Sequence, residues 1–306
     1  MLAKLTNWLL GLFGITAIRQ ATLKRLMEQQ GTEKPLDGLT ATLQAMKIMA
    51  NQNQRQLLHH QISVKWDMVD LLERQRPPRS HMTCPLCGHH NEVSAFNEWV
   101  TACIFGGGTL TRHQCPECDL IFGDEKMLRL SEAELSRDYE WHYQLFTEGD
   151  STAQEIRAFH ALQPRKDGIY LNWGAGAWSK TIEKLRQEGW DVYGYEPHNS
   201  ATTHSSHIIS RMEELAAMRF DGIFSNNVLE HLRHPARELS IMRSLLKSDG
   251  KMSHATPCFE YLYEFTRFHL FFYLGKSRTI LASQAGLDIE VFIQDGEFMN
   301  IILAPK

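Results

Sequence analysis

Cysteine is scarce in this sequence, with six residues in 306. So few cysteines exclude the disulfide scaffold of small secreted domains, and the Cys-x2-Cys pairs among them suit metal binding in a reducing compartment. No apolar run reaches the ~20 residues that a membrane-spanning helix needs. Nor is there a run of five or more like charges, the usual footprint of a nucleic-acid-binding protein. We therefore expect a cytoplasmic protein with no transmembrane anchor and no nucleic-acid partner.

The composition is that of an ordinary globular protein, with 43% hydrophobic and 22% charged residues. Its length suggests two folded units, or one domain of about 200 residues with a long appendage. Composition and motif spacing divide the chain into a helical region (1–80), a metal-binding module (81–125), a helical connector (126–166) and an α/β domain (167–306). The first region is mildly basic, with eleven Lys or Arg against six Asp or Glu.

The first eighteen residues are apolar, but they include Lys4 and two glycines, and no small-residue cleavage site follows them. Neither a spanning helix nor a secretory signal is therefore expected. Leu5, Leu9 and Leu12 would share one face of a helix. Such a helix could lie on a membrane surface through residues 1–25 or pack against protein. We favour packing or oligomerisation, with peripheral contact at the cytoplasmic membrane face as the alternative.

A seven-residue apolar spacing predicts a long helix in the second half of the helical region. The first seam of this repeat contains Leu36, Leu43, Ala50, Leu57, Val64 and Leu71. A second seam begins at Leu39 and Met46 but continues with polar residues, so a coiled coil would be loose. Pro77 and Pro78 end the helix. We expect homo-oligomers formed through this helix.

Two Cys-x2-Cys pairs give the strongest local chemical signal. The four cysteines are Cys84, Cys87, Cys115 and Cys118. Two such turns supply the four thiolates of a tetrahedral zinc ion, so they predict a structural zinc ribbon with no coordination position left for catalysis. Gly88 and Asp119 follow the two turns, at positions where φ is often positive and where glycine and aspartate tolerate it. Cys103 and Cys258 are expected to be buried and inert.

The period of the apolar pattern changes at residue 169. A buried strand, Ile169–Trp173, leads into the glycine turn Gly174–Gly176 and then into a helix. A second strand begins at Asp191 and ends at Glu196, twenty residues after the turn. In a nucleoside-binding βαβ unit of this kind, the backbone of the turn approaches the ligand, and the carboxylate accepts the ribose hydroxyls. The pattern fits both a dinucleotide and S-adenosylmethionine.

The segments that follow distinguish between these two candidate ligands. FDGIFSNNVLEHL, SLLKSDG and HATP occur in this order between Phe220 and Pro257. Over roughly Gly168 to Pro305 the chain thus resembles the class I S-adenosylmethionine-dependent methyltransferases. The resemblance implies an α/β, Rossmann-like sheet of seven strands, mostly parallel with an antiparallel last strand, preceded here by the zinc ribbon and the long helix. An Asp-Gly turn at Gly296 predicts the hairpin that completes such a sheet.

The resemblance also implies a cofactor site. Gly174, Ala175 and Gly176 would approach the methionine part, and Glu196 would bind the ribose. Arg211 and Met212 would lie at the adenine, and Asn226 and Asn227 on the sulfonium side. Two residues depart from the family pattern: Asn172 stands where an acid usually precedes the glycines, and Trp178 replaces the third glycine. Binding of the methionine end must therefore rely on the backbone and on other groups.

Methyl transfer from a sulfonium requires the acceptor in line at about 3 to 3.5 Å. A neutral hydroxyl must also lose its proton, and His231, just after the third strand, is the first candidate base, with His269 the second. The aromatic segment 257–277 would cover the acceptor, and Tyr139 and Tyr143 could reach the site from the connector. The zinc ribbon beside this domain is similar to that of methyltransferases of bacterial sugar and polysaccharide biosynthesis, which implies a saccharide acceptor.

Two other functions fit parts of the sequence. A nicotinamide (NAD)-dependent sugar-modifying enzyme would use the same βαβ unit, but the third glycine and a Tyr-x-x-x-Lys pair are missing. A zinc-ribbon adaptor with an inactive nucleotide fold would explain the changes at Asn172 and Trp178. Within the methyltransferase family itself, Glu230 and His231 could equally be structural, with Glu230 capping or pairing and His231 packing beneath the site.

Overall fold

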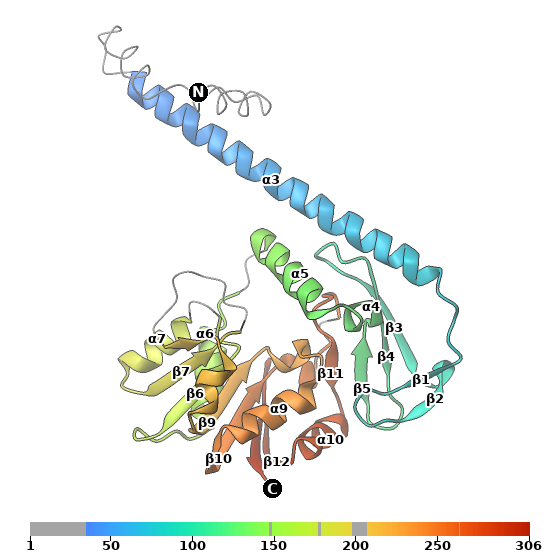
Figure 1. The fold of residues 1–306 in the computed structure, drawn as a ribbon, viewed down its shortest axis with the longest axis vertical. Helices are drawn as coiled ribbons and strands as arrows, with labels where there is room; N and C mark the ends of the chain where they lie inside the picture. Colours follow the sequence, from blue (N-terminus) through green and yellow to red (C-terminus); the bar gives the residue numbers. More distant parts are fainter. Residues whose placement is uncertain (1–34, 147–148, 177–178, 198–206, 263) are drawn as a thin grey trace. The chain divides into compact units, whose positions relative to one another are not determined.

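A computed structural model gives the fold of the chain (Figure 1) and describes residues 35–146, 149–176, 179–197, 207–262 and 264–306. The apolar helix expected near the N-terminus, with its membrane contact through residues 1–25, lies outside the described residues, as does Trp178. The chain forms two units, Met1–Leu57 and Leu58–Lys306.

Helix α3, Pro35–Arg74, is the long helix that the heptad spacing predicts, and it ends shortly before the two prolines. Two residues of its C-terminal part, Ile62 and Trp66, are fully buried in the second unit. Leu57 and Val64 of the predicted seam remain 58% and 41% exposed. The buried face of this helix is therefore not its heptad face. Among the described residues, no helix combines the length and the hydropathy that crossing a bilayer requires.

The cysteine turns lie in a small β module. Strands β1 (His81–Thr83) and β2 (His90–Glu92) form a hairpin around the first turn, and the 3-10 turn η1 (Val93–Ala95) follows. A second, antiparallel sheet has the strand order β11-β5-β4-β3. Its strands are β3 (Asn97–Ala102), β4 (Thr109–Gln114), β5 (Leu120–Gly123) and β11 (Phe271–Tyr273). Because β11 comes from much later in the chain, the C-terminal half completes the sheet of this module (Figure 1).

Three helices connect the module to the larger sheet. They are α4 (Glu125–Leu128), α5 (Glu132–Leu145) and α6 (Thr152–Ala161). Ser131 and Glu134 form a reciprocal capping box at the start of α5, which satisfies two backbone N–H groups that the first turn of a helix leaves unpaired. The start of α5 is therefore determined locally, by this capping box.

The larger sheet has seven strands in the order β12-β13-β10-β9-β6-β7-β8. The strands are β6 (Ile169–Trp173), β7 (Asp191–Tyr195), β8 (Ile208–Ile209), β9 (Phe220–Asn226), β10 (Leu246–Ala255), β12 (Leu287–Asp295) and β13 (Phe298–Pro305). Strands β8, β7, β6, β9 and β10 pair in parallel, whereas β13 is antiparallel to both of its neighbours. This confirms the predicted α/β sheet, including the hairpin at Gly296.

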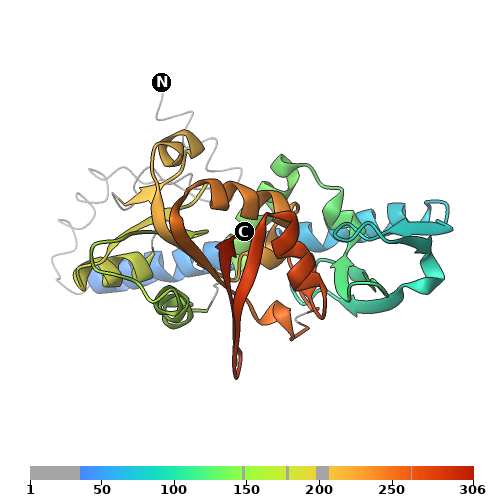
Figure 2. The ribbon, with the colours of Figure 1, turned by 90° about the horizontal axis from the view of Figure 1, so that it is seen from below.

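Helices cover both faces of this sheet (Figure 2). Helices α6 and α7 (Lys180–Gln187) pack on one face, against alternate strand residues such as Tyr170 and Phe224. Helices α9 (Pro235–Ser244) and α10 (Ser277–Gln284) pack on the other, where Leu171 and Ile223 belong to the core. The remaining short elements are α8 (Met212–Ala216), η2 (Leu229–His231) and η3 (Pro257–Phe259). The segment after β9 thus forms a single 3-10 turn, and α9 begins only at Pro235.

Candidate functional site

The predicted glycine turn crosses from the end of β6 to the end of β7. The backbone N–H groups of Gly174 and Ala175 both donate to the Tyr195 carbonyl, at 2.9 and 3.1 Å. Gly174 has φ +76°, and a Cβ there would lie 2.7 Å from a methyl of Val228. Gly176 has φ +71° and borders open space, with no atom within 4 Å of an added Cβ. Both positions require glycine, and the second leaves the backbone accessible to a ligand.

Glu196 and Gly176 meet at this edge of the sheet, as the sequence predicts. The Gly176 N–H donates to Oε2 of Glu196 at 3.1 Å. The carboxyl ends of parallel strands are where open α/β sheets bind their ligands. The contact therefore places the carboxylate and the glycine turn of the predicted ribose site side by side.

The other predicted cofactor residues lie at or near the same edge. Asn226 ends β9 and pairs in register with Ala255 of β10. Asn227 has φ +54°, and its N–H donates to the Ala255 carbonyl at 2.9 Å. Arg211 is exposed and forms an ion pair with Glu214 at the start of α8. Met212 is half-buried against the core.

Asn172, which replaces the family's usual acid, holds a carboxylate from another element. Its side chain is buried, and Nδ2 donates to Oε2 of Glu155 in α6 at 2.8 Å. The Ser151 hydroxyl donates to the second oxygen of Glu155 at 2.5 Å. The carboxylate of Glu155 thus lies next to residue 172, where the family's usual acid would be. No spacing motif links Glu155 to the glycine turn, so sequence reasoning missed it.

His231 lies in η2 against the α5 side chain predicted to reach it. Its Nδ1 is 3.0 Å from the Phe268 carbonyl and 3.2 Å from the Tyr139 hydroxyl. Because the carbonyl can only accept, Nδ1 carries the proton in this arrangement and Nε2 keeps its lone pair. Tyr139 also stacks on Phe268 and on Tyr143. A neutral His231 can therefore take a proton through Nε2.

A neighbouring histidine, His142, does not have this capacity. It lies among the rings of Phe105, Phe146 and Phe268. Burial, with the Arg267 charge nearby, lowers its pKa to about 4. It stays uncharged at neutral pH and serves packing.

The second predicted base, His269, lies 4.9 Å from His231 between ring centroids. It belongs to a group of three ligand-bearing side chains with Glu230 and Cys258, whose ligand atoms all lie within 4.8 Å of one another. The Cys258 sulfur is 3.6 Å from Nδ1 of His269. Cys258 is buried, as predicted, but its surroundings differ from those of an inert core cysteine.

The four predicted zinc ligands converge in the β module. Sγ of Cys84 and Cys118 lie 3.7 Å apart, and those of Cys87 and Cys115 lie 3.6 Å apart. A tetrahedral ion with Zn–S bonds of about 2.3 Å requires sulfur separations of about 3.8 Å, so the four thiols fit zinc. Hydrogen bonding to Cys118 lowers the pKa of Cys84 to about 5. One thiolate is therefore available at neutral pH.

The two cysteine turns have matching backbones. Gly88 N–H donates to the Cys84 carbonyl at 3.1 Å, and Asp119 N–H donates to the Cys115 carbonyl at 3.0 Å. Gly88 has φ +75° and Asp119 has φ +65°, as their positions after the second cysteine predict. The sequence thus fixes the geometry of both turns locally.

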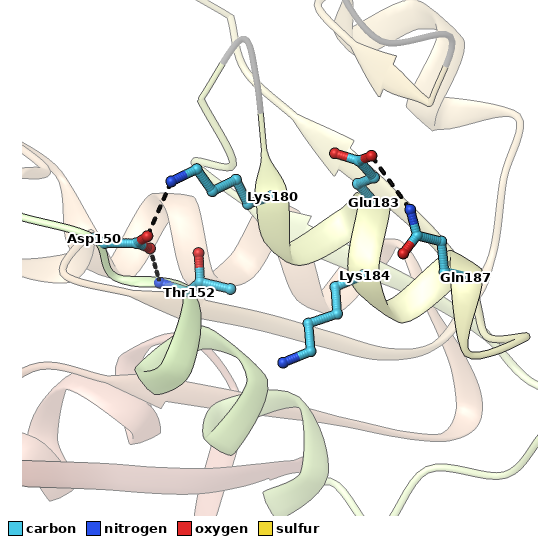
Figure 3. A pocket seen from close by; sticks show the side chains of 6 residues that line it. All are labelled: Asp150, Thr152, Lys180, Glu183, Lys184 and Gln187. Carbon is cyan, nitrogen blue, oxygen red and sulfur yellow. Dashed lines mark hydrogen bonds and ion pairs between the residues drawn. The ribbon is translucent and has the colours of Figure 1, made fainter.

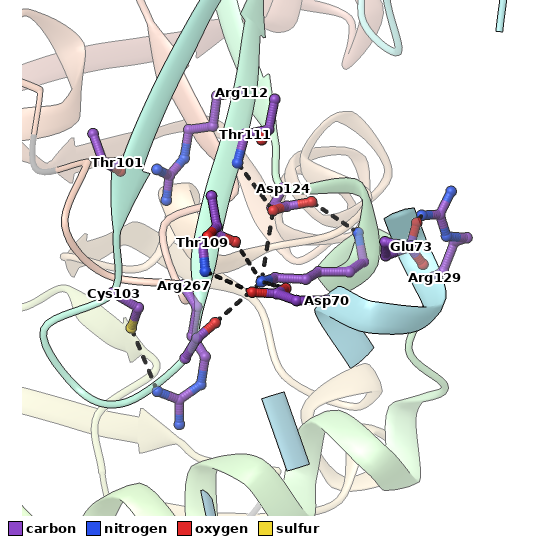
Figure 4. Close-up of polar contacts among 12 residues, drawn as sticks. Asp70, Glu73, Thr101, Cys103, Thr109, Thr111, Arg112, Asp124, Arg129 and Arg267 are labelled. Atoms are coloured by element: carbon purple, nitrogen blue, oxygen red, sulfur yellow. Dashed lines mark hydrogen bonds and ion pairs between the residues drawn. The ribbon is translucent and has the colours of Figure 1, made fainter. Parts of the chain in front are cut away.

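Buried charges join the β module to the elements around it (Figure 4). Asp70 of α3 accepts hydrogen bonds from the Thr109 N–H at 2.8 Å and from Lys126 at 2.5 Å. Arg267 pairs with Asp138 of α5 at 2.5 Å, and both side chains are fully buried. The end of α3, the module and α5 therefore form one packed body within residues 58–306.

Arg112 of β4 anchors the segment that carries His269. This fully buried guanidinium donates to the carbonyls of Glu264 and Thr266, both at 2.6 Å, and to that of His269 at 3.0 Å. A planar guanidinium can serve several acceptors at once. A side chain of the cysteine module thus positions the segment beside the candidate base.

A shallow polar pocket lies between the start of α6 and helix α7 (Figure 3). Its lining residues are Asp150, Thr152, Lys180, Glu183, Lys184 and Gln187. An ion pair between Lys180 and Asp150 at 3.0 Å crosses it. None of these residues is a predicted site residue.

Residues 142–286 match the family model described as a methyltransferase domain. No curated protein sequence matches the chain. Among solved structures, it is similar to the 1,6-didemethyltoxoflavin-N1-methyltransferase of Burkholderia thailandensis with bound S-adenosylhomocysteine, at 13% identity over 63% of this chain and 94% of that one, with a TM-score of 0.44. It is also similar to a TehB-like SAM-dependent methyltransferase of Corynebacterium glutamicum, at 17% identity over 57% and 100% of the two chains, with a TM-score of 0.37.

The domain match confirms the predicted enzyme class. Residues 142–286 carry the methyltransferase domain that the sequence predicts, with S-adenosylmethionine as its expected methyl donor. The predicted methyltransferase is thereby favoured over the nicotinamide-dependent enzyme and the inactive adaptor.

Proposed function

We propose that this methyltransferase acts on a hydroxyl group of a saccharide or polysaccharide, with His231 as general base. The observation that carries the proposal is the hydrogen bond between Nδ1 of His231 and the Phe268 carbonyl, 3.0 Å long. It leaves Nε2 as the proton acceptor, and a neutral hydroxyl needs such an acceptor. The methyl group itself is already activated by the sulfonium, so positioning supplies much of the remaining catalysis.

Aromatic rings beside this base support a sugar acceptor. Tyr143 is 56% exposed and lies 6.1 Å from Tyr139 between ring centroids, and Tyr139 in turn contacts His231. Tyr261 and Phe265, in the segment expected to cover the acceptor, are also half exposed. Exposed rings of this kind offer an apolar face with a polar rim, which suits the C–H face of a sugar ring.

For the cofactor, we propose that Glu196 binds the ribose and that the backbone of Gly174, Ala175 and Gly176 approaches the methionine part. Asn226 and Asn227 would face the sulfonium, and Arg211 and Met212 the adenine. The Glu155 carboxylate, held by Asn172 at 2.8 Å, would bind the methionine ammonium in place of the family's acid. A hydrogen bond from an ammonium to an ionised acceptor is roughly twice as strong as a hydrogen bond between neutral groups.

An acceptor screen tests the function. The protein is incubated with S-adenosylmethionine carrying a labelled methyl group and with nucleotide sugars or glycan extracts, and products are identified by mass spectrometry. We expect a labelled methyl ether on a saccharide. His231→Asn should lower kcat by about 100-fold or more, remove the base limb of the pH–rate profile and leave S-adenosylhomocysteine affinity unchanged. Transfer to proteins or small aromatic molecules alone would contradict the saccharide assignment.

We also propose that α3 mediates homo-oligomerisation. In the first unit, Leu43 and Leu57 of the heptad seam are 57% and 58% exposed, and apolar seams of this spacing pair with a second helix. Light scattering should report a smaller particle for a Leu43→Lys/Leu57→Lys double variant than for the unaltered chain. An unchanged mass would contradict this proposal.

A further inference from the structure

Glu230 is a buried carboxylic acid with no ordinary partner. Its side chain is fully buried in η2, and neither carboxylate oxygen makes a hydrogen bond of good geometry among the described residues; its own N–H and the Thr256 hydroxyl act on it only weakly. Burial raises its pKa, against weaker opposing effects of His231 and the Thr256 hydroxyl. Leaving such a group unsatisfied is costly, so its presence calls for a ligand or a cation.

Two soft ligands lie beside this carboxylate. Cys258 of η3 and His269, just before β11, bring a sulfur and a ring nitrogen within 4.8 Å of a Glu230 oxygen and of each other. These three residues come from separate elements that are each fixed by buried hydrogen bonds. The Tyr273 hydroxyl donates to the carbonyl of Leu229, beside Glu230, at 2.8 Å. The Thr256 hydroxyl accepts from the Cys258 N–H at 3.1 Å.

We infer that Glu230, Cys258 and His269 form a second metal site that takes a divalent transition ion, zinc foremost. Thiolate, imidazole and carboxylate are the three ligand types that zinc accepts in proteins. Three protein ligands leave a fourth coordination position open, in contrast to the four cysteines of the β module. The bound cation would supply the partner that the Glu230 carboxylate lacks.

The role of this site rests on the proposed function. His269 is partly buried, and its ring lies 4.9 Å from that of His231 between centroids, so a group bound to the ion would lie near the proposed base. An acceptor hydroxyl bound there would have its pKa lowered. Its proton goes to Nε2 of His231, its oxygen forms a bond to the methyl carbon, and the carbon–sulfur bond breaks with its electron pair staying on sulfur. His269 then acts as a metal ligand instead of a second base.

Metal content tests the site independently of catalysis. The full-length protein is loaded with excess zinc, dialysed, and measured by inductively coupled plasma mass spectrometry. We expect two zinc ions per chain, and one in each of Glu230→Gln, Cys258→Ser and His269→Asn. Cys103→Ser replaces another buried cysteine and should keep two. One zinc ion in the unaltered chain, or two in all three variants, overturns the inference.

Zinc X-ray absorption on the unaltered chain covers the case in which a variant does not fold. Two filled sites give an average of about 2.5 sulfur ligands per zinc, with nitrogen and oxygen as the remainder, whereas the cysteine module alone gives 4. An all-sulfur spectrum overturns the inference. Failure of the proposed function would show differently, as two bound zinc ions without transfer of a methyl group to any saccharide.

Discussion

The cysteine module and the edge of the seven-stranded sheet build their sites in opposite ways. The module draws its four sulfurs from two short turns, and each turn holds its own backbone in place. The sheet edge draws its polar groups from α6, β6, β7 and η2, which are far apart in the sequence. The first kind of site is specified by local spacing, and the second only by the packed fold. Substitutions in the two regions should differ accordingly.

The largest effect on stability is expected at the four-cysteine site of the β module. Cys115 is fully buried, and Cys115→Ser removes one thiolate from a four-sulfur set. Because zinc binding is coupled to folding in small modules, we expect a loss of at least about 5 kcal/mol of stability and of the module's zinc. Thermal unfolding and zinc content check this, with Cys103→Ser as the control. A variant that unfolds like the unaltered chain would show that the module does not depend on metal.

Arg112→Met tests the link between the two regions. The change leaves the carbonyls of Glu264, Thr266 and His269 without their buried donor. We expect a loss of about 3–5 kcal/mol in denaturant unfolding and faster hydrogen exchange in residues 264–270. Arg112→Lys should recover only part, because an ammonium cannot reproduce the guanidinium fork. A loss below about 1 kcal/mol would mean that the two regions are independent.

Acid should weaken the sheet through His254 of β10. This side chain is fully buried beside Ser225, and burial lowers its pKa to about 3. Since the unfolded chain binds a proton near pH 6.5, the stabilisation is complete above that pH and is lost as pH falls toward 3. Between pH 7 and pH 5, the loss in unfolding free energy from this residue amounts to about 2 kcal/mol.

His254→Asn should therefore flatten the dependence of unfolding free energy on pH between 6.5 and 5. The exposed His160 has no such environment, and His160→Asn should keep the slope of the unaltered chain. Identical slopes in all three proteins would assign the acid sensitivity elsewhere. The comparison uses differences between proteins, so protonation of the zinc thiolates cancels.

Glu155→Gln gives the smallest effect and the most specific one. The variant keeps the hydrogen bond to Asn172 but removes the charge, so affinity for S-adenosylhomocysteine should fall roughly 10-fold, about 1.4 kcal/mol. Affinity for methylthioadenosine, which lacks the amino acid part, should not change. Calorimetry measures both.

Two further variants sharpen this test. Glu183→Gln neutralises a carboxylate of α7 in the polar pocket and should leave both affinities intact. Combining Glu155→Gln with Asn172→Asp returns one negative charge to the site and should restore S-adenosylhomocysteine binding. An equal loss for both ligands in Glu155→Gln would mean that Glu155 only supports the fold.

Local patterns were sufficient to predict much of the molecule. The apolar run at Ile169–Trp173 is a strand with those bounds, the heptad spacing is one helix, and the Asp-Gly turn closes a hairpin. In each case, neighbours within one element determine the backbone. The contact between Gly176 and Glu196 was also predictable, because parallel strands end at one edge.

What the sequence did not reveal depends on distant contacts. Glu155 meets Asn172 only because α6 packs on the sheet, and Cys258 meets Glu230 only because η3 and η2 follow neighbouring strands. Strand β11 is three residues long and pairs with β5, which lies about half the chain's length earlier in the sequence. No periodicity or motif spacing identifies these distant partners, because each segment by itself is only a short apolar stretch.

That late strand has a consequence for synthesis. Tyr273 pairs with Leu120, a separation of about 150 residues, and such non-local pairing is slow to form. While the ribosome is still adding the methyltransferase strands, β5 has an unpaired edge, even if zinc has already closed the cysteine turns. A nascent chain halted before residue 271 would therefore display an apolar strand edge suited to association with other chains.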